Sequence, residues 1–95
     1  MHYILFYDVV KDYVARRAPF RESHMKLLKE AYDRGELVIA GALTEPADGS
    51  VLVFRGQSES VAEDFAWSDP YVRNGLVTAW RVRKWMTVIG DGARP

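Results

Sequence analysis

The sequence predicts a single α+β domain whose elements follow the order β-α-β-β-α-β. Its length of 95 residues fits one small domain. Four stretches rich in β-branched and aromatic residues alternate with two stretches of helical periodicity in that order. The turn-forming segment Thr44-Glu45-Pro46-Ala47-Asp48-Gly49 separates the second and third of these stretches, so they form a hairpin. This is the split βαβ, or ferredoxin-like, arrangement, in which a four-stranded antiparallel sheet carries two helices on one face.

The first half of the chain begins with a strand from His2 to Val9 or Val10, which is rich in Tyr, Ile, Phe and Val. A charged stretch from Lys11 to Arg17 follows. We expect the first helix to run from about Pro19 to Arg34, because proline suits the first helical turn and Gly35 suits the position after the last one.

The second half of the chain continues with the two strands of the hairpin, from Glu36 to Leu43 and from Ser50 to Arg55. The second helix is expected to be capped by Ser58 and to end near Trp67, because Pro70 pushes the residue before it into extended geometry. The last strand is expected from Leu76 to Trp85 or beyond. We expect the domain to span residues 1–95, with a tail that frays from about residue 90.

Both faces of the first strand are substantially apolar. Its even positions include Ile4 and Phe6, and its odd positions include Tyr3, Leu5 and Tyr7. An antiparallel sheet with one wet face should instead alternate apolar and polar residues. Two helices cover only one face, so the sequence predicts that a second copy of the chain covers the other face, as a homodimer with two-fold symmetry.

Composition excludes several classes of function. The 13 basic and 13 acidic residues cancel, which argues against a nucleic-acid or anionic membrane partner. The absence of cysteine excludes a disulfide scaffold, a thiol nucleophile and a zinc–thiolate site, and is compatible with a reducing, cytoplasmic location. The apolar runs are too short to cross a bilayer, and the N-terminus has no signal-peptide pattern.

His24 is the first candidate for chemistry. It lies within the apolar stripe of the first helix, which also includes Phe20, Leu27, Leu28, Ala31 and Tyr32. The imidazole should therefore point toward the sheet. Two interpretations remain open: a core histidine bonded to a backbone carbonyl, or an acid–base group at the floor of a cleft that titrates near neutrality.

Asp69 and Arg21 are the next candidates. Asp69 either caps the turn that begins at Pro70 or orients His24, because the start of the first helix and the end of the second can lie close together in this fold. Arg21 precedes His24 by almost one helical turn and is either a solvated side chain or a clamp for a substrate carboxylate or phenolate.

Other chemistries fit the sequence poorly. The only two histidines, His2 and His24, stand far apart without a metal-binding spacing, so we expect no metal site. No glycine-rich phosphate loop and no serine nucleophile motif occurs. Any catalysis must therefore use imidazole, carboxylate and guanidinium groups, and we expect it to need no cofactor.

An ordered set of short motifs resembles the YciI-like (YCII-related) proteins over nearly the full length. The motifs are Tyr3-Ile4-Leu5-Phe6-Tyr7, Arg17, Arg21-Glu22-Ser23-His24 with Leu27, Gly35-Glu36-Leu37, Ala40-Gly41-Ala42-Leu43, Ala66-Trp67-Ser68-Asp69-Pro70-Tyr71, and Gly75-Leu76. The resemblance implies a dimeric α+β barrel and an active site built around His24 and Asp69. The chain departs from many family members at Gly41-Ala42, where a proline after the glycine is frequent.

The resemblance and the residues together predict a small enzyme without a cofactor. One branch of the family looks like dehydrochlorinases of hydroxylated aromatic compounds, in which a His–Asp pair does acid–base work. We expect His24 and Asp69 to be catalytic, and Arg21, Tyr71 and Gly41 to contact a small, aromatic or anionic substrate. The alternatives are a dimeric module that binds a ligand or a protein without catalysis and, from the fold alone, a cofactor-free monooxygenase.

Overall fold

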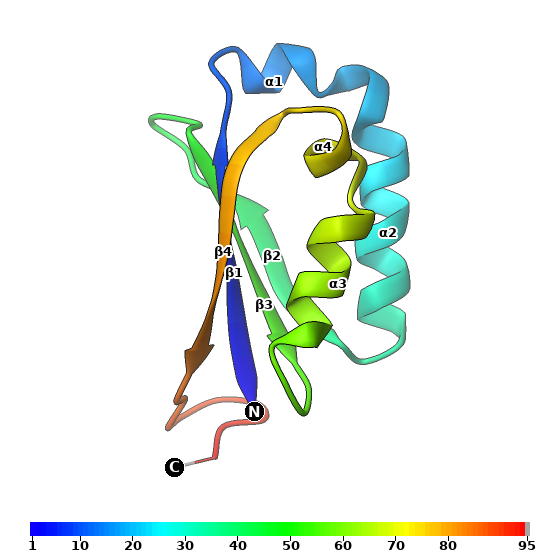
Figure 1. The fold of residues 1–95 in the computed structure, drawn as a ribbon. Helices are drawn as coiled ribbons and strands as arrows, with labels where there is room; N and C mark the ends of the chain where they lie inside the picture. Colours follow the sequence, from blue (N-terminus) through cyan, green and yellow to red (C-terminus); the bar gives the residue numbers. More distant parts are fainter. Residues whose placement is uncertain (95) are drawn as a thin grey trace.

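A four-stranded antiparallel sheet forms the framework of the protein (Figure 1). The computed structural model describes residues 1–94. Its strands are β1 (His2–Val9), β2 (Leu37–Ala42), β3 (Gly49–Arg55) and β4 (Val77–Trp85), and they lie in the order β2-β3-β1-β4. This order confirms the predicted ferredoxin-like α+β fold, because the two strands of the hairpin are neighbours and β1 lies between β3 and β4.

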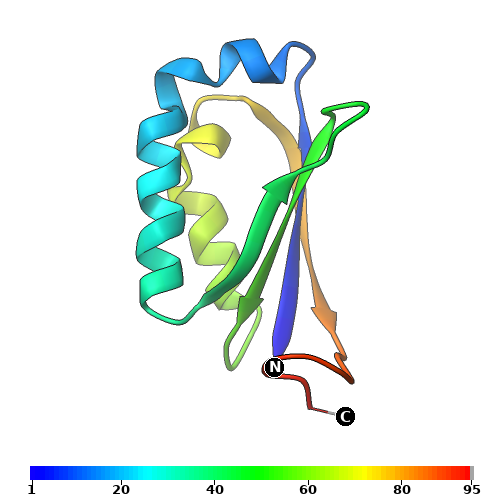
Figure 2. The ribbon, with the colours of Figure 1, turned by 180° about the vertical axis from the view of Figure 1, so that it is seen from behind.

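Two helices, α2 (Arg21–Asp33) and α3 (Ser60–Ser68), lie side by side over one face of the sheet, and both views show no helix on the other face (Figures 1 and 2). Three shorter segments complete the helical layer: α1 (Tyr13–Arg16), the 3-10 helix η1 (Ala18–Phe20) and α4 (Pro70–Arg73). α1 and α4 lie at the end of the sheet where β1 finishes and β4 begins (Figure 1).

The helix boundaries differ from the prediction at three points. The first long helix begins at Arg21 rather than Pro19, because Ala18–Phe20 forms a separate 3-10 turn, and the predicted charged stretch contains the short helix α1. The second helix begins at Ser60, and the Ser58 hydroxyl accepts a hydrogen bond from the Ser60 amide at 3.3 Å just outside it. The helix preferences of the residues near each boundary therefore do not fix where the helices begin.

The core lies between the helices and the inner face of the sheet. Tyr3, Leu5 and Tyr7, the odd positions of β1, are buried there, so the odd face of this strand is the one that the helices cover. The helical stripe is shorter than predicted, because Ala31 is buried whereas Tyr32 is 62% exposed beside it. The buried stripe of α2 therefore ends at Ala31, within the last turn of the helix.

The other face of the sheet carries apolar side chains that no helix covers. Ile4 and Phe6 lie on it, and their register partners on β3 are Val53 and Val51. Ile39 on the edge strand β2 is opposite Val53 and is 67% exposed. The Arg81 guanidinium lies 4.5 Å from the centroid of the Phe6 ring on the same face. We call this surface the open face.

Residues after β4 form turns that pass beneath the start of β1 (Figure 1). The Arg94 amide donates to the Thr87 carbonyl at 3.2 Å, and His2 Nδ1 lies 2.7 Å from the Thr87 hydroxyl. Fraying of this tail stays a prediction, and Pro95 lies outside the described residues. No helix within residues 1–94 is long and apolar enough to span a membrane.

Candidate functional site

A cavity of about 310 Å³ opens between the helices and the end of the sheet. Four predicted site residues line it: Arg21 and His24 from α2, Tyr71 from α4 and Gly41 from β2. Apolar side chains, including Met25, Leu28 and Leu52, form much of the remaining wall. The volume lies at the lower end of the range for ligand pockets, so the cavity suits a compact molecule.

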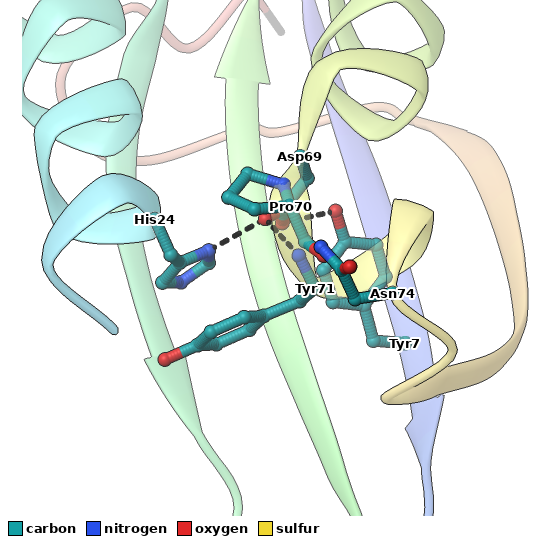
Figure 3. Close-up of polar contacts among 6 residues, drawn as sticks. All are labelled: Tyr7, His24, Asp69, Pro70, Tyr71 and Asn74. Atoms are coloured by element: carbon teal, nitrogen blue, oxygen red, sulfur yellow. Dashed lines mark hydrogen bonds and ion pairs between the residues drawn. The ribbon is translucent and has the colours of Figure 1, made fainter. Parts of the chain in front are cut away.

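The fifth predicted residue, Asp69, lies behind His24 and is completely buried. Its Oδ1 atom is 2.8 Å from His24 Nδ1, across 45 positions of sequence (Figure 3). His24 itself is only 9% exposed. The fold thus brings the start of α2 and the end of α3 together and closes a buried imidazole–carboxylate pair.

The Asp69 carboxylate accepts two further hydrogen bonds. The Tyr7 hydroxyl donates to Oδ2 at 2.7 Å, and the backbone amide of Tyr71 donates to Oδ1 at 3.0 Å (Figure 3). The bond to the Tyr71 amide makes Asp69 the N-cap of α4. The two interpretations left open for Asp69, a cap and a partner for His24, therefore describe one carboxylate that makes both contacts.

The protonation state of the Tyr7 hydroxyl indicates which atoms of this network carry hydrogen. Burial, together with the negative charge of Asp69, raises the pKa of the Tyr7 hydroxyl far above its ordinary value, so Tyr7 stays protonated and donates. The carboxylate is then the acceptor in all three bonds, which assigns the hydrogen of the imidazole to Nδ1. In the neutral ring the lone pair is on Nε2, and His24 lines the cavity.

Tyr71 packs directly against the imidazole. The two rings are stacked, with centroids 3.7 Å apart and planes inclined by 10°. The Tyr71 hydroxyl lies at the end of the ring away from Asp69 (Figure 3). It is buried and has no hydrogen-bond partner within residues 1–94. Burial raises the pKa of this hydroxyl, and the positive charges of Arg17 and Arg21 oppose that rise.

Among the aromatic and charged residues of the site, three were not predicted from the sequence: Tyr7, Tyr13 and Arg17. Tyr13 meets the Tyr71 ring edge-on at 5.7 Å between centroids, and the Arg17 guanidinium lies 5.1 Å from the centroid of the Tyr13 ring. Both come from the short helix α1 and its C-cap, in the stretch that was expected to be only charged. The inward position of Tyr7 on β1 was the signal that could have indicated a buried hydroxyl in need of a partner.

Gly41 lies on the cavity wall in a strand, and a Cβ placed there would meet no atom within 4 Å. The glycine is therefore not required by the packing of this chain. No group of three or more metal-ligating side chains that could hold an ion occurs within residues 1–94.

Comparison with solved structures extends the fold to known proteins. The 5-chloro-2-hydroxyhydroquinone dehydrochlorinase of Burkholderia phenoliruptrix, solved in complex with 2,5-dihydroxybenzoquinone, superposes with a TM-score of 0.76. The match covers 99% of this chain and 100% of that one at 18% identity. A protein of Agrobacterium tumefaciens superposes with a TM-score of 0.61 at 15% identity, again over 99% and 100% of the two chains. The three proteins therefore share one α+β fold over nearly their full lengths.

Comparison of sequences supplies the family. An uncharacterized protein of Haemophilus influenzae is 28% identical over 85 residues, which cover 80% of this chain and 87% of that protein. Residues 1–86 match the YCII-related domain, which includes every residue of the cavity and of the Asp69 network. The chain therefore belongs to the YCII-related family.

Proposed function

We propose that the protein is a small enzyme, without a cofactor, that performs acid–base chemistry of the lyase or isomerase type on a compact, anionic or aromatic metabolite. One observation carries this proposal: a buried imidazole, bonded to a buried carboxylate through Nδ1, lines a cavity of ligand size. A dehydrochlorinase with the same fold, in complex with a quinone, supports a small cyclic substrate.

In this proposal His24 Nε2 removes a proton from the substrate. The electron pair that is released forms a new double bond, and either a leaving group departs or a proton returns at another carbon. Asp69 keeps the lone pair on Nε2 before the transfer and stabilises the imidazolium after it. A positioned acid–base group of this kind contributes about 10²- to 10⁴-fold in rate. Every step uses groups of this chain, so the proposed mechanism requires no cofactor.

Arg21 and Tyr71 are the proposed substrate contacts. No aspartate or glutamate lines the cavity, whereas the guanidinium groups of Arg17 and Arg21 do. An anionic substrate would be attracted by these charges, which would hold it against the imidazole. Gly41 would contribute only a backbone wall.

We also propose that the working unit is a homodimer in which two open faces pack together. The partly or fully exposed apolar residues of the open face, Ile4, Phe6, Val51 and Ile39, support this proposal, because no helix within residues 1–94 covers them. The absence of cysteine suits a reducing compartment, so we place the protein in the cytoplasm.

Proton exchange in D2O tests the catalytic proposal. The protein is incubated with hydroxylated and chlorinated monocyclic phenols and with small keto acids, and proton NMR follows loss of substrate C–H signal or appearance of product. The key variant is His24→Asn, because the asparagine amide can still donate to Asp69 in place of Nδ1 but offers nothing in place of Nε2. Lys26→Gln, an exposed change on the same helix, is the matched control.

We expect at least one compound to exchange or eliminate in the wild-type protein and the rate to fall by about 10²-fold or more in His24→Asn, with Lys26→Gln unchanged. An exchange rate that survives His24→Asn contradicts the proposal. Saturable binding of compounds by the wild-type protein without any exchange would favour the alternative, a ligand-binding module.

A further inference from the structure

The hydroxyl of Tyr71 is a buried polar group that makes no hydrogen bond within residues 1–94. The side chain is 1% exposed, and its oxygen has no hydrogen-bond partner within residues 1–94. Buried hydroxyls in native proteins are nearly always bonded, and an exception indicates a partner that the protein alone does not supply. Because Tyr71 lines the cavity, that partner can be a ligand atom.

The guanidinium groups near this hydroxyl have no carboxylate partner within residues 1–94. Arg17 and Arg21 both line the cavity, and both act on the Tyr71 hydroxyl as positive charges. The three ion pairs recorded within residues 1–94 involve neither of them, and the cavity wall contains no carboxylate. The cavity therefore combines a hydroxyl without a hydrogen-bond partner and two guanidinium groups without a counterion within residues 1–94.

We propose that Tyr71, Arg17 and Arg21 form an oxyanion site, in which the Tyr71 hydroxyl donates to a negatively charged oxygen of the ligand and the two guanidinium groups balance its charge. Hydrogen bonds with one ionised partner are the stronger kind, so the three groups select an anion over its neutral analogue. The stacked rings of Tyr71 and His24 place this site beside the imidazole, so one molecule can contact both (Figure 3).

The apolar wall limits the rest of the ligand. Met25, Leu28 and Leu52 offer no hydrogen-bonding side chains, and the volume of about 310 Å³ suits a single ring or a short chain. The ligand class is thus a compact monoanion with an apolar body, either a phenolate or a carboxylate. This inference rests on the proposed function in one respect: the anion is a substrate only if the protein is an enzyme. Binding of the anion does not depend on that proposal, because the anion can bind without reacting.

Ligand binding is measured on the His24→Asn background as well as on the wild-type chain, so that the result does not depend on turnover. The probes are benzoate, its neutral isostere benzamide, and 4-nitrophenol, whose phenolate is detected by its absorbance. Benzoate and 4-nitrophenolate distinguish a carboxylate from a phenolate ligand, and amide chemical shifts of labelled protein locate the binding.

We expect at least one anion to bind saturably and benzamide to bind at least tenfold more weakly. Arg17→Gln and Arg21→Gln should each reduce binding of the anion by about tenfold, the effect of losing one interaction with a charged group. Arg16→Gln removes the same charge from the neighbouring exposed position and should leave binding unchanged. Equal binding of benzoate and benzamide, equal effects of Arg16→Gln and Arg17→Gln, or no saturable binding of either anion overturns the proposal.

Tyr71→Phe separates a ligand-binding hydroxyl from a structural one. The hydroxyl has no hydrogen-bond partner within residues 1–94, so its removal should leave the unfolding midpoint in urea unchanged or raise it. Binding of the anion should nevertheless fall by about tenfold. A Tyr71→Phe protein that is less stable but binds the anion as the wild type does would show that the hydroxyl is structural, and would overturn the assignment.

Discussion

The imidazole of His24 lies flat on the phenol ring of Tyr71, with the ring centroids 3.7 Å apart and the planes within 10° of parallel. The hydrogen bond to Asp69 fixes which ring nitrogen faces the cavity, and the stack fixes the plane in which the ring lies. Asp69 also caps the helix that carries Tyr71, so one carboxylate positions both rings.

The stack itself should contribute measurably to stability. Tyr71→Phe retains the aromatic face, whereas Tyr71→Leu fills most of the same space without one. We expect Tyr71→Leu to have a free energy of unfolding about 0.5–1.5 kcal/mol below that of Tyr71→Phe, the usual worth of an aromatic pair beyond its buried area. Urea unfolding of the two variants measures the difference, and equal midpoints would show that the stack adds nothing.

Tyr7→Phe should damage the site by removing the hydroxyl that donates to Asp69. It leaves Asp69 Oδ2 buried without its only donor within residues 1–94, which should lower the free energy of unfolding by about 1–3 kcal/mol. Proton exchange on any substrate found should slow as well, because the carboxylate is no longer fixed. Tyr3→Phe, a buried tyrosine on the same face of β1, is the control, and an equal loss in both variants contradicts this role for Tyr7.

His2 should make stability depend on pH. Burial first, and then the charges of the N-terminal amine and of Arg55, lower the pKa of His2 below 6.5 in the folded chain. As the pH falls below about 6.5 the unfolded chain binds the proton first, so stability should decrease from there down through the folded-state pKa.

The difference between wild type and His2→Asn measures this effect. Asparagine does not titrate, so the loss of unfolding free energy between about pH 7.5 and about pH 5 should be smaller in the variant. The same loss in both proteins would assign the pH dependence to other groups.

If the homodimer forms through the open faces, a charged residue introduced on this face should separate the two chains. Ile39 on that face and Tyr32 on α2 are similarly exposed, at 67% and 62%. In sedimentation experiments at micromolar concentration we expect a dimer for the wild type and for Tyr32→Lys, and a folded monomer for Val51→Lys and Ile39→Lys, because a lysine buried between two sheets is unpaired. A wild-type monomer at that concentration would falsify the pairing of open faces.

Much of the fold could be predicted from local patterns. The alternation of Tyr3, Leu5 and Tyr7 with Ile4 and Phe6 indicated that both faces of β1 are apolar, but not which of them the helices cover. The turn chemistry before Gly49 predicted the hairpin. The start of the first helix was predicted two residues too early, because the proline in Ala18–Phe20 suits the first turn of a 3-10 helix as well as that of an α-helix.

The site was predictable only in part, for a related reason. His24 stood out because a titratable ring interrupts an apolar stripe. Asp69 was a candidate because the end of the second helix can lie near the start of the first, and the resemblance to a family favoured both residues. Tyr7 lies 62 positions from Asp69, and nothing near it in the sequence distinguishes it from an ordinary core tyrosine. Arg17 lies among other basic residues, and only the edge-on packing of Tyr13 on Tyr71 brings that segment to the cavity.

The amide of Tyr71 gives the protein a built-in probe. Its proton is held by the same carboxylate oxygen that pairs with His24, so it exchanges with solvent only when that cap opens. The rate of hydrogen–deuterium exchange at this single amide would thus report how often the hydrogen bonds to Asp69 Oδ1, the oxygen that also pairs with His24, open. A ligand that tightens the pair would slow the exchange at this amide even if the ligand never touches it.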